Sequence, residues 1–417
     1  MRSGPPPFDI PAAHFMAGLL WLGLGSAGLV IVAPDLARGN ILLPHALAVT
    51  HAFTLGFLTT IVFGALHQLF PALLGVGMRS AMVARIGFWV LEAGILQLVA
   101  GLWFWLPYLQ ASGWVLIFAA VGVVSWNLLP QRRRATQGRL VGRYISGGHS
   151  AFGFAMLLGL ARIGETAGWW HFDRLGTIAA HFHLGALGFV TLTAVGVSSR
   201  ILPMFLASND PPSWQLRWIG PFAAAGLLLF TPAAILSWQV VRLIGGLLLA
   251  LSMALYLSLV AGYFRARTQP LDLALAHVGT AFGFLGLTVV AGLALLLVPH
   301  RFHPEWWAAY AILGLLGWLV LLTVGVLYRI LAFLSWLHLS GGRKVGGRRI
   351  EPADLTRRRW AWTSLIIWTG GVLAATAGLA FGRPPVAQTG AALIAAGVAL
   401  VLAQVARAAL ILRVADS

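Results

Sequence analysis

The sequence predicts an all-α integral membrane protein of about twelve transmembrane helices. Of its 417 residues, 59% are hydrophobic and only 9% are charged, more apolar surface than a water-soluble core needs. The apolar residues fall into runs of roughly 20, the length that crosses a bilayer as a helix. The runs cover approximately residues 11–33, 41–75, 83–107, 110–130, 144–165, 173–207, 214–236, 239–264, 271–298, 304–338, 360–382 and 384–414.

The basic residues predict how these runs are oriented. They cluster in loops that follow even-numbered runs, chiefly 131–143 and 341–359. The positive-inside rule therefore predicts that both termini are cytoplasmic, in a plasma (inner) membrane of the bacterial type. The net charge of +17 is then an orientation signal, and we expect contact with membrane lipid but no nucleic-acid partner. Runs 2, 6 and 10 pass from outside to inside and are long enough to project or to bend.

An internal repeat connects these three long runs. Segments 51–71, 183–203 and 312–332 align without gaps. Two glycine positions coincide in all three segments, at Gly56, Gly188 and Gly317 and at Gly64, Gly196 and Gly325. Because the copies share one direction, we predict a single transmembrane domain (1–417) of three four-helix units around an axis along the membrane normal. The units cover approximately 1–137, 138–267 and 268–417.

Two aligned histidines predict a cofactor site in the outer half of the membrane. His51 in run 2 and His183 in run 6 occupy the same position of the repeat and lie at the same depth. His181 is two residues before His183 and lies on the opposite side of run 6. A membrane-buried imidazole is costly unless it is bonded, and two imidazoles facing each other across a bundle suit bis-histidine ligation of haem. The alternative for each of these histidines is a structural role, in which its imidazole forms a hydrogen bond to a neighbouring helix. Gly56 and Gly188 either make room for a porphyrin or allow close helix packing.

Four other histidines lie toward the cytoplasmic side. They stand near the start of runs 1, 5 and 9 and near the end of run 2: His14, His149, His277 and His67. Their similar placement indicates either an inherited structural hydrogen bond or a second site for a haem, a metal or a quinone. The choice between these stays open from the sequence.

Glu92 is the one acidic residue deep within an apolar run. An isolated buried carboxyl must be protonated or paired. It is a candidate proton relay, and the alternative is a polar contact with Gln97 or with a histidine of another run.

The stretch HFHLGALGFVTLTAVG (181–196) resembles the tenth helix of subunit I in the heme-copper oxidase superfamily, especially the cbb3-type oxidases and nitric oxide reductases. In that family the two histidines of the pair bind the high-spin and low-spin haems. The resemblance implies that His181 is a high-spin ligand and that His183 and His51 are the low-spin ligands. Twelve spans with cytoplasmic termini also fit that fold.

Departures from the family pattern limit the resemblance. The His-x-His pair stands in run 6 instead of run 10, run 7 contains no histidine, and the sequence has no adjacent histidine pair. The oxidase copper triad is therefore missing, and copper is only a candidate cofactor. The absence of cysteine also excludes iron–sulfur clusters and covalent c-type haem. The chain is similar as well to the NnrS haem proteins linked to nitric oxide stress, although it lacks an Arg-rich opening.

These observations predict a membrane haem protein that binds b-type haem between the second and sixth helices. The expected activity is electron transfer, or binding and reduction of a small gas such as nitric oxide, as an oxidoreductase. The expected partners are a soluble cytochrome or a quinone, within a larger redox complex. Two alternatives remain: a non-redox transporter or channel whose histidines relay protons or substrate, and a non-catalytic membrane subunit of a redox complex.

Overall fold

The computed structural model describes residues 7–135, 137–169, 171, 173–208, 214–298, 303–335, 344–345, 348–349 and 352–414. Part of the predicted basic loop 341–359 lies outside these residues. The described part is nearly all helical, which confirms the predicted fold class, and one two-stranded ribbon accompanies the helices.

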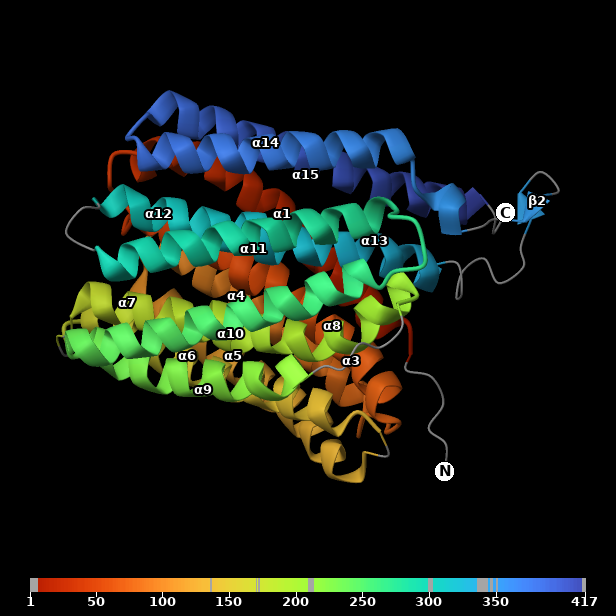
Figure 1. Ribbon diagram of the computed structural model, residues 1–417, viewed down its shortest axis with the longest axis horizontal. Helices are drawn as coiled ribbons and strands as arrows, with labels where there is room; N and C mark the ends of the chain where they lie inside the picture. The colour runs from red at the N-terminus through yellow and green to blue at the C-terminus, as the bar shows by residue number, and fades with distance from the viewer. Residues whose placement is uncertain are drawn as a thin grey trace. The chain divides into compact units, whose positions relative to one another are not determined.

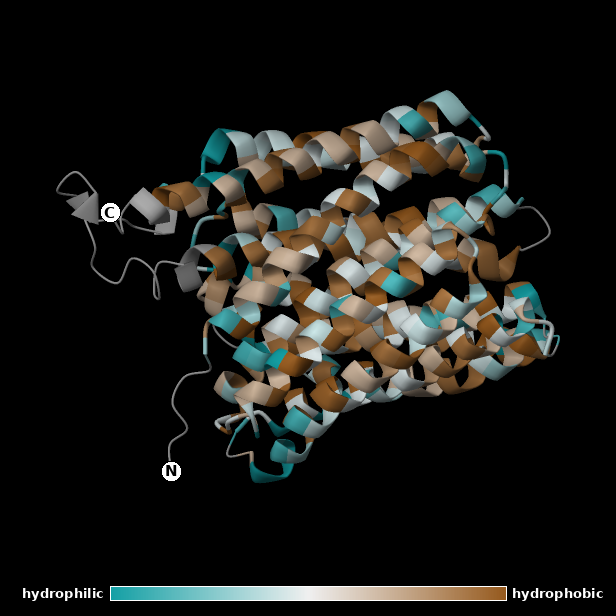
Figure 2. Ribbon diagram, turned by 180° about the vertical axis from the view of Figure 1, so that it is seen from behind, coloured by the Kyte–Doolittle hydropathy of each residue, from teal (hydrophilic) through white to brown (hydrophobic). Residues whose placement is uncertain are grey.

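Each of the twelve predicted runs forms one helix or one continuous series of helical segments. Eleven of these, within the described residues, are long and apolar enough to cross a membrane, and Figure 2 shows their hydrophobic residues along the helix lengths. The remaining one is α6, whose first half is more polar. The elements are α1 (Asp9–Leu36), α2 (Pro44–His51), η1 (Ala52–Thr59), α3 (Thr60–Leu74), α4 (Ala81–Trp103), α5 (Pro107–Leu128), η2 (Leu129–Arg134), α6 (Arg139–Thr166), α7 (Arg174–His183), η3 (Leu184–Thr191), α8 (Leu192–Leu206), α9 (Trp214–Ile235), α10 (Gln239–Arg265), α11 (Leu273–Leu297), α12 (Pro304–Ile312), η5 (Leu313–Val320), α13 (Leu321–Ser335), β1 (Lys344–Val345), β2 (Arg348–Arg349), η7 (Pro352–Leu355), α14 (Arg358–Ala380) and α15 (Pro384–Val414).

The helices formed by runs 2, 6 and 10 each contain an eight-residue π-helical segment. These segments, η1, η3 and η5, occupy equivalent positions in the aligned sequence repeats. In the first two, a threonine hydroxyl at the end of the segment donates to the carbonyl oxygen five residues earlier, from Thr59 to Thr54 at 2.9 Å and from Thr191 to Ala186 at 2.8 Å. π-Helical turns are rare in proteins, and those that occur are often at functional sites. Two of the three segments, η1 and η3, begin directly after His51 and His183.

The chain divides into two compact units. The first comprises residues 1–18, 50–270 and 289–301, and the second comprises residues 19–49, 271–288 and 302–417. Within the units, consecutive helices pack as antiparallel pairs: α4 with α5, α9 with α10, and α14 with α15. The last pair is seen side by side in Figure 1.

Glycines hold these helix pairs together in the same way three times. Gly113, Gly245 and Gly390 each face the backbone nitrogen of the residue fifteen positions earlier: Leu98, Phe230 and Ala375. A Cβ on Gly113 would lie 2.5 Å from that nitrogen, and one on Gly245 would lie 2.6 Å away. Only glycine permits such an approach of two backbones. The same close contact thus recurs in three helix pairs, while the repeat of four-helix units around an axis stays a prediction.

A second contact recurs between each aligned segment and a preceding helix. The glycines at the second aligned position each pack against the side chain of one preceding helix, and the pairs are Gly64 with His14, Gly196 with Tyr144 and Gly325 with His277. Tyr144, and not His149, is therefore the counterpart of His14 and His277. Its hydroxyl donates to the Leu216 carbonyl at 2.6 Å and accepts from the Gly220 amide at 2.9 Å.

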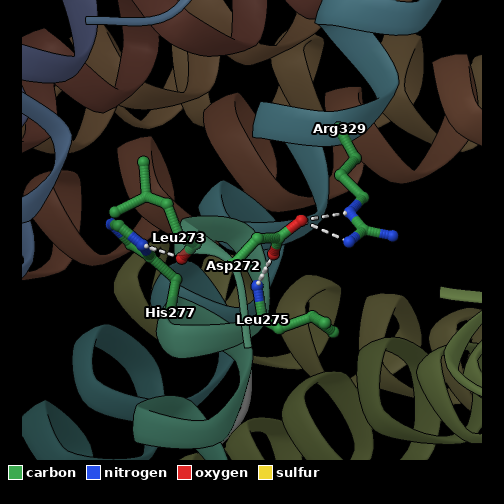
Figure 3. A network of polar contacts seen from close by, with 5 residues as sticks. All are labelled: Asp272, Leu273, Leu275, His277 and Arg329. Atoms are coloured by element: carbon green, nitrogen blue, oxygen red, sulfur yellow. Dashed lines mark hydrogen bonds and ion pairs between the residues drawn. The ribbon is translucent and has the colours of Figure 1, made fainter. Parts of the chain in front are cut away.

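In the second unit, Asp272 directly precedes α11. Its Oδ1 accepts a hydrogen bond from the Leu275 amide at 2.9 Å, as an N-cap does. Its Oδ2 pairs with the guanidinium of Arg329 on α13, whose Nε lies 3.1 Å away (Figure 3). The pair ties the start of α11 to α13, one turn from His277.

Candidate functional site

The structure brings two of the predicted ligand histidines together in the first unit. The ring of His51, at the end of α2, lies beside the ring of His181 on α7. Their ring centres are 6.1 Å apart, and the ring planes are inclined by 36°. Both side chains are half-buried.

The imidazole of His181 is held by the neighbouring helix α6. Its Nδ1 lies 2.7 Å from the carbonyl oxygen of Ala155, and because a carbonyl only accepts, Nδ1 carries the proton. A Cβ on Gly159 would lie 3.4 Å from Cε1 of the ring. The absence of a side chain at this position therefore leaves space for the imidazole. The Nε2 atom is thereby left as the nitrogen with a lone pair, the arrangement found in metal-bound histidines.

His183 has different neighbours. Its Nδ1 donates to the carbonyl oxygen of Ala179 in its own helix at 2.8 Å. Its ring centre lies 4.6 Å from that of Phe230 on α9, and its side chain is buried. The His51 ring thus lies beside His181, the member of the His-x-His pair that the sequence alignment does not match to it.

The glycines around the pair have separate uses. A Cβ on Gly188 would lie 2.6 Å from Cβ of Ala151 and 3.1 Å from Leu227, so Gly188 serves close helix packing. A Cβ on Gly185 would meet nothing within 4 Å. Gly185 stands one turn after His181 on the same side of the helix, so the open space lies there.

Charged groups also lie near this histidine pair. Arg162 of α6 forms an ion pair with Glu165, and their side chains are only 17% and 18% exposed. Arg162 is close enough to act electrostatically on His181, and Arg174 on Arg162. The carboxylate of Glu165 thus already pairs with Arg162, and the Arg174 side chain is exposed.

The predicted cytoplasmic-side histidines divide between the two units. In the first unit the ring centres of His14 and His67 are 5.7 Å apart, and the His149 ring is stacked on Phe63 with centres 5.7 Å apart. His277 belongs to the second unit, where its ring centre is 5.0 Å from that of Tyr328. The four residues are all buried.

These four imidazoles form the same hydrogen bond within their own helices. The Nδ1 atom of each lies 2.7–2.9 Å from the carbonyl oxygen four residues earlier in its own helix, in the pairs His14–Ile10, His67–Phe63, His149–Ile145 and His277–Leu273. The Nε2 atoms of His67, His149 and His277 are buried and have no hydrogen-bond partner among the described residues. Each Nε2 is therefore a lone pair available to a Lewis acid or a donor.

Glu92 has a hydroxyl partner. Thr60, the first residue of α3, donates to Oε1 of Glu92 at 2.9 Å. Gln97, the partner considered from the sequence, accepts instead from Ser112 at 2.7 Å. The role of Glu92 as a proton relay stays a prediction.

Several residues around the histidines were not identified from the sequence. Ala155 and Phe230 act through a backbone carbonyl and an apolar ring, and Gly159 through the lack of a side chain. None of these leaves a chemical signature in a single sequence. Arg162 and Glu165, spaced three residues apart within a predicted apolar run, were the one available signal.

Comparison with known proteins places this fold. No protein-family model matches the sequence, and no curated protein sequence matches it. A heme-copper terminal oxidase dimer determined by cryo-EM contains a similar chain, with a TM-score of 0.67. The match covers 96% of this chain and 84% of the oxidase chain, at 13% sequence identity. The protein therefore has a heme-copper oxidase-like fold, as expected, while the cbb3-type and NnrS assignments stay resemblances.

Proposed function

We propose that this integral membrane protein binds a b-type haem between His51 and His181. Its proposed activity is electron transfer, or binding and reduction of a small gas such as nitric oxide. When bound, a haem supplies a one-electron redox centre and, where an axial position opens, a site for a gas ligand. The protein's own groups hold, orient and shield it.

The distance between the two rings carries this proposal. Two imidazoles on opposite sides of one metal, with metal–nitrogen bonds of about 2.0–2.1 Å, have ring centres about 6.3 Å apart. The His51 and His181 ring centres are 6.1 Å apart. Nε2 of His181 would be the ligand atom, because Nδ1 donates to the Ala155 carbonyl. The space beside Gly185 suits a flat group.

This proposal changes the pairing predicted from the sequence. There His51 and His183 were the ligands of one haem and His181 stood on the other face. The contacts of His183 with Ala179 and Phe230 leave His183 outside the proposed pair. It stays a candidate ligand for a separate group on its own side of the helix.

The setting of the proposed site follows from charge and fold. We propose a bacterial-type plasma membrane with both termini cytoplasmic, because the basic loops follow even-numbered apolar runs of the sequence. The oxidase-like fold favours a soluble cytochrome or a quinone as electron partner and a place in a larger redox complex.

The test is the haem spectrum of purified protein. We expect a pyridine haemochrome signal of b-type haem and a low-spin band in the reduced-minus-oxidised spectrum. His51→Ala and His181→Ala should each abolish the low-spin band, whereas His183→Ala and the exposed control His303→Ala should keep it. Size-exclusion chromatography reports whether each variant is folded.

Two outcomes would contradict the proposal in different ways. Loss of the band in His183→Ala but not in His181→Ala would restore the pairing from the sequence alignment. Folded wild-type protein without haem would reject a haem function altogether, and pH-dependent substrate binding by that colourless protein would establish the transporter alternative.

A further inference from the structure

We propose that His14 and His67 bind a single Cu(I) ion through their Nε2 atoms, at a site separate from the His51–His181 pair. The two imidazoles come from α1 and α3 of the first unit, and each side chain is only 1% exposed. The inference does not depend on the proposed haem. It also differs from the oxidase copper triad, which needs an adjacent histidine pair that this chain lacks.

The chemistry of the two rings favours a Lewis acid between them. Nδ1 of His14 donates to Ile10 at 2.8 Å, and Nδ1 of His67 donates to Phe63 at 2.7 Å. Each Nε2 therefore carries a lone pair, and the Nε2 atom of His67 is buried without a hydrogen-bond partner in the part of the chain that the structure describes. Two acceptor nitrogens cannot hydrogen-bond to each other. A Lewis acid between them would accept an electron pair from each Nε2 atom.

The packing of α1 on α3 limits the size of that group. A Cβ on Gly64 would lie 2.5 Å from Cβ of His14, and a Cβ on Gly18 would lie 2.6 Å from Ile61. The two helices are thus in direct contact at the histidines and one turn beyond them. A porphyrin is broader than an imidazole and would have to separate these helices. A single ion needs no such space.

The number of ligands and the distance between the rings then select the ion. With metal–nitrogen bonds of about 2.0–2.1 Å, two imidazoles on opposite sides of one ion have ring centres about 6.3 Å apart. The ring centres of His14 and His67 are 5.7 Å apart, so a shift of about 0.6 Å brings the two rings to the near-linear arrangement of two-coordinate Cu(I). In the part of the chain that is described, no three His, Cys, Asp or Glu side chains are spaced to hold one ion. The protein therefore supplies two nitrogens.

Cu(I) is the ion that this set of ligands suits. Zinc is bound with four ligands, and calcium and magnesium require several oxygens. Imidazole is a good copper ligand, and monovalent copper is stable with two. A single positive charge is also cheaper to bury than a double one. Phe88, whose ring centre is 4.8 Å from that of His14, adds an apolar wall that disfavours a hydrated ion.

The test is copper stoichiometry on the purified full-length protein. Ascorbate-reduced protein is incubated with Cu(I) buffered by bicinchoninate, desalted, and measured by mass spectrometry for copper per chain. We expect one copper in the wild type and less than a tenth of that in His14→Gln and in His67→Gln. His277→Gln is the matched control, because His277 is equally buried, bonds its own helix through Nδ1 and has an unpartnered Nε2.

X-ray absorption at the copper edge of the wild type gives a measurement that requires no variant. A first shell of two nitrogens near 2 Å is expected. Less than stoichiometric copper in the wild type, copper retained by both variants, or equal loss in His277→Gln would overturn the proposal. Copper without any haem signal would reject the haem function and leave this inference standing, and haem without copper would reject this inference alone.

Discussion

The ring of His181 lies against Gly159, and this contact gives the sharpest test of the proposed haem site. A Cβ at position 159 would lie 3.4 Å from Cε1 of the ring, an ordinary contact, so Gly159→Ala should change little. Valine extends two methyl groups roughly 1.5 Å beyond that Cβ. At least one of these methyl groups would then lie closer to the His181 ring than the carbon–carbon contact distance of about 3.5–4.0 Å.

The expected size of the effect follows from the cost of overpacking. Extra methyl groups in a packed site cost about 1–3 kcal/mol. If this strain displaces the His181 ring from the Ala155 carbonyl, affinity for haem falls by roughly 5- to 150-fold, since 1.4 kcal/mol is tenfold. Changes to groups that orient a metal ligand typically cost about 10–100-fold, in agreement with this range.

The assay is titration of haem-free protein with hemin, followed at the Soret band. Gly153→Val is the matched control, because it places the same side chain on the same helix where a Cβ meets nothing within 4 Å. We expect a graded series in which Gly159→Ala and Gly153→Val resemble the wild type and Gly159→Val binds weakly. Wild-type affinity in Gly159→Val would refute the role of α6 in orienting His181.

Two further predictions concern the fold. In Gly113→Ala the new Cβ would lie 2.5 Å from the backbone nitrogen of Leu98, so we expect a loss of about 1–3 kcal/mol and a lower unfolding temperature in detergent; Gly122→Ala, in the same helix with nothing within 4 Å, should not lower it, and equal shifts would contradict the packing argument. Asp272→Asn keeps an acceptor for the Leu275 amide and loses only an exposed ion pair, at about 0–1 kcal/mol, whereas Asp272→Ala also loses the cap, at about 1 kcal/mol more. Identical thermal unfolding of the two Asp272 variants would show that the cap contributes nothing.

The helices were predictable because each is specified by its own stretch of sequence. A run of about 20 apolar residues forms a helix in lipid whatever surrounds it, so all twelve runs correspond to helices. The excess length of runs 2, 6 and 10 was also visible. Its accommodation in the π-helical segments η1, η3 and η5 was not, because no residue type distinguishes a π-turn from an α-turn.

The pairing of histidines was harder to predict, for a geometric reason. Alignment of the repeats gives His51 and His183 the same depth and the same direction relative to their own helices. Under a rotational repeat, equivalent residues face equivalent but separate neighbours, so equal depth does not imply contact. The residue beside His51 is His181, about 200° around the helix from His183.

The hydrogen bonds from Nδ1 to the same helix have a consequence for proton transport. Five buried imidazoles are fixed in this way, and they are His14, His67, His149, His183 and His277. Conduction through an imidazole requires one nitrogen to receive a proton while the other releases its own. Here the second nitrogen faces a carbonyl oxygen that cannot carry the proton onward. Because Nδ1 stays bonded to this carbonyl, Nε2 of each ring serves as an electron-pair donor. This arrangement favours metal coordination and disfavours the transfer of protons from ring to ring.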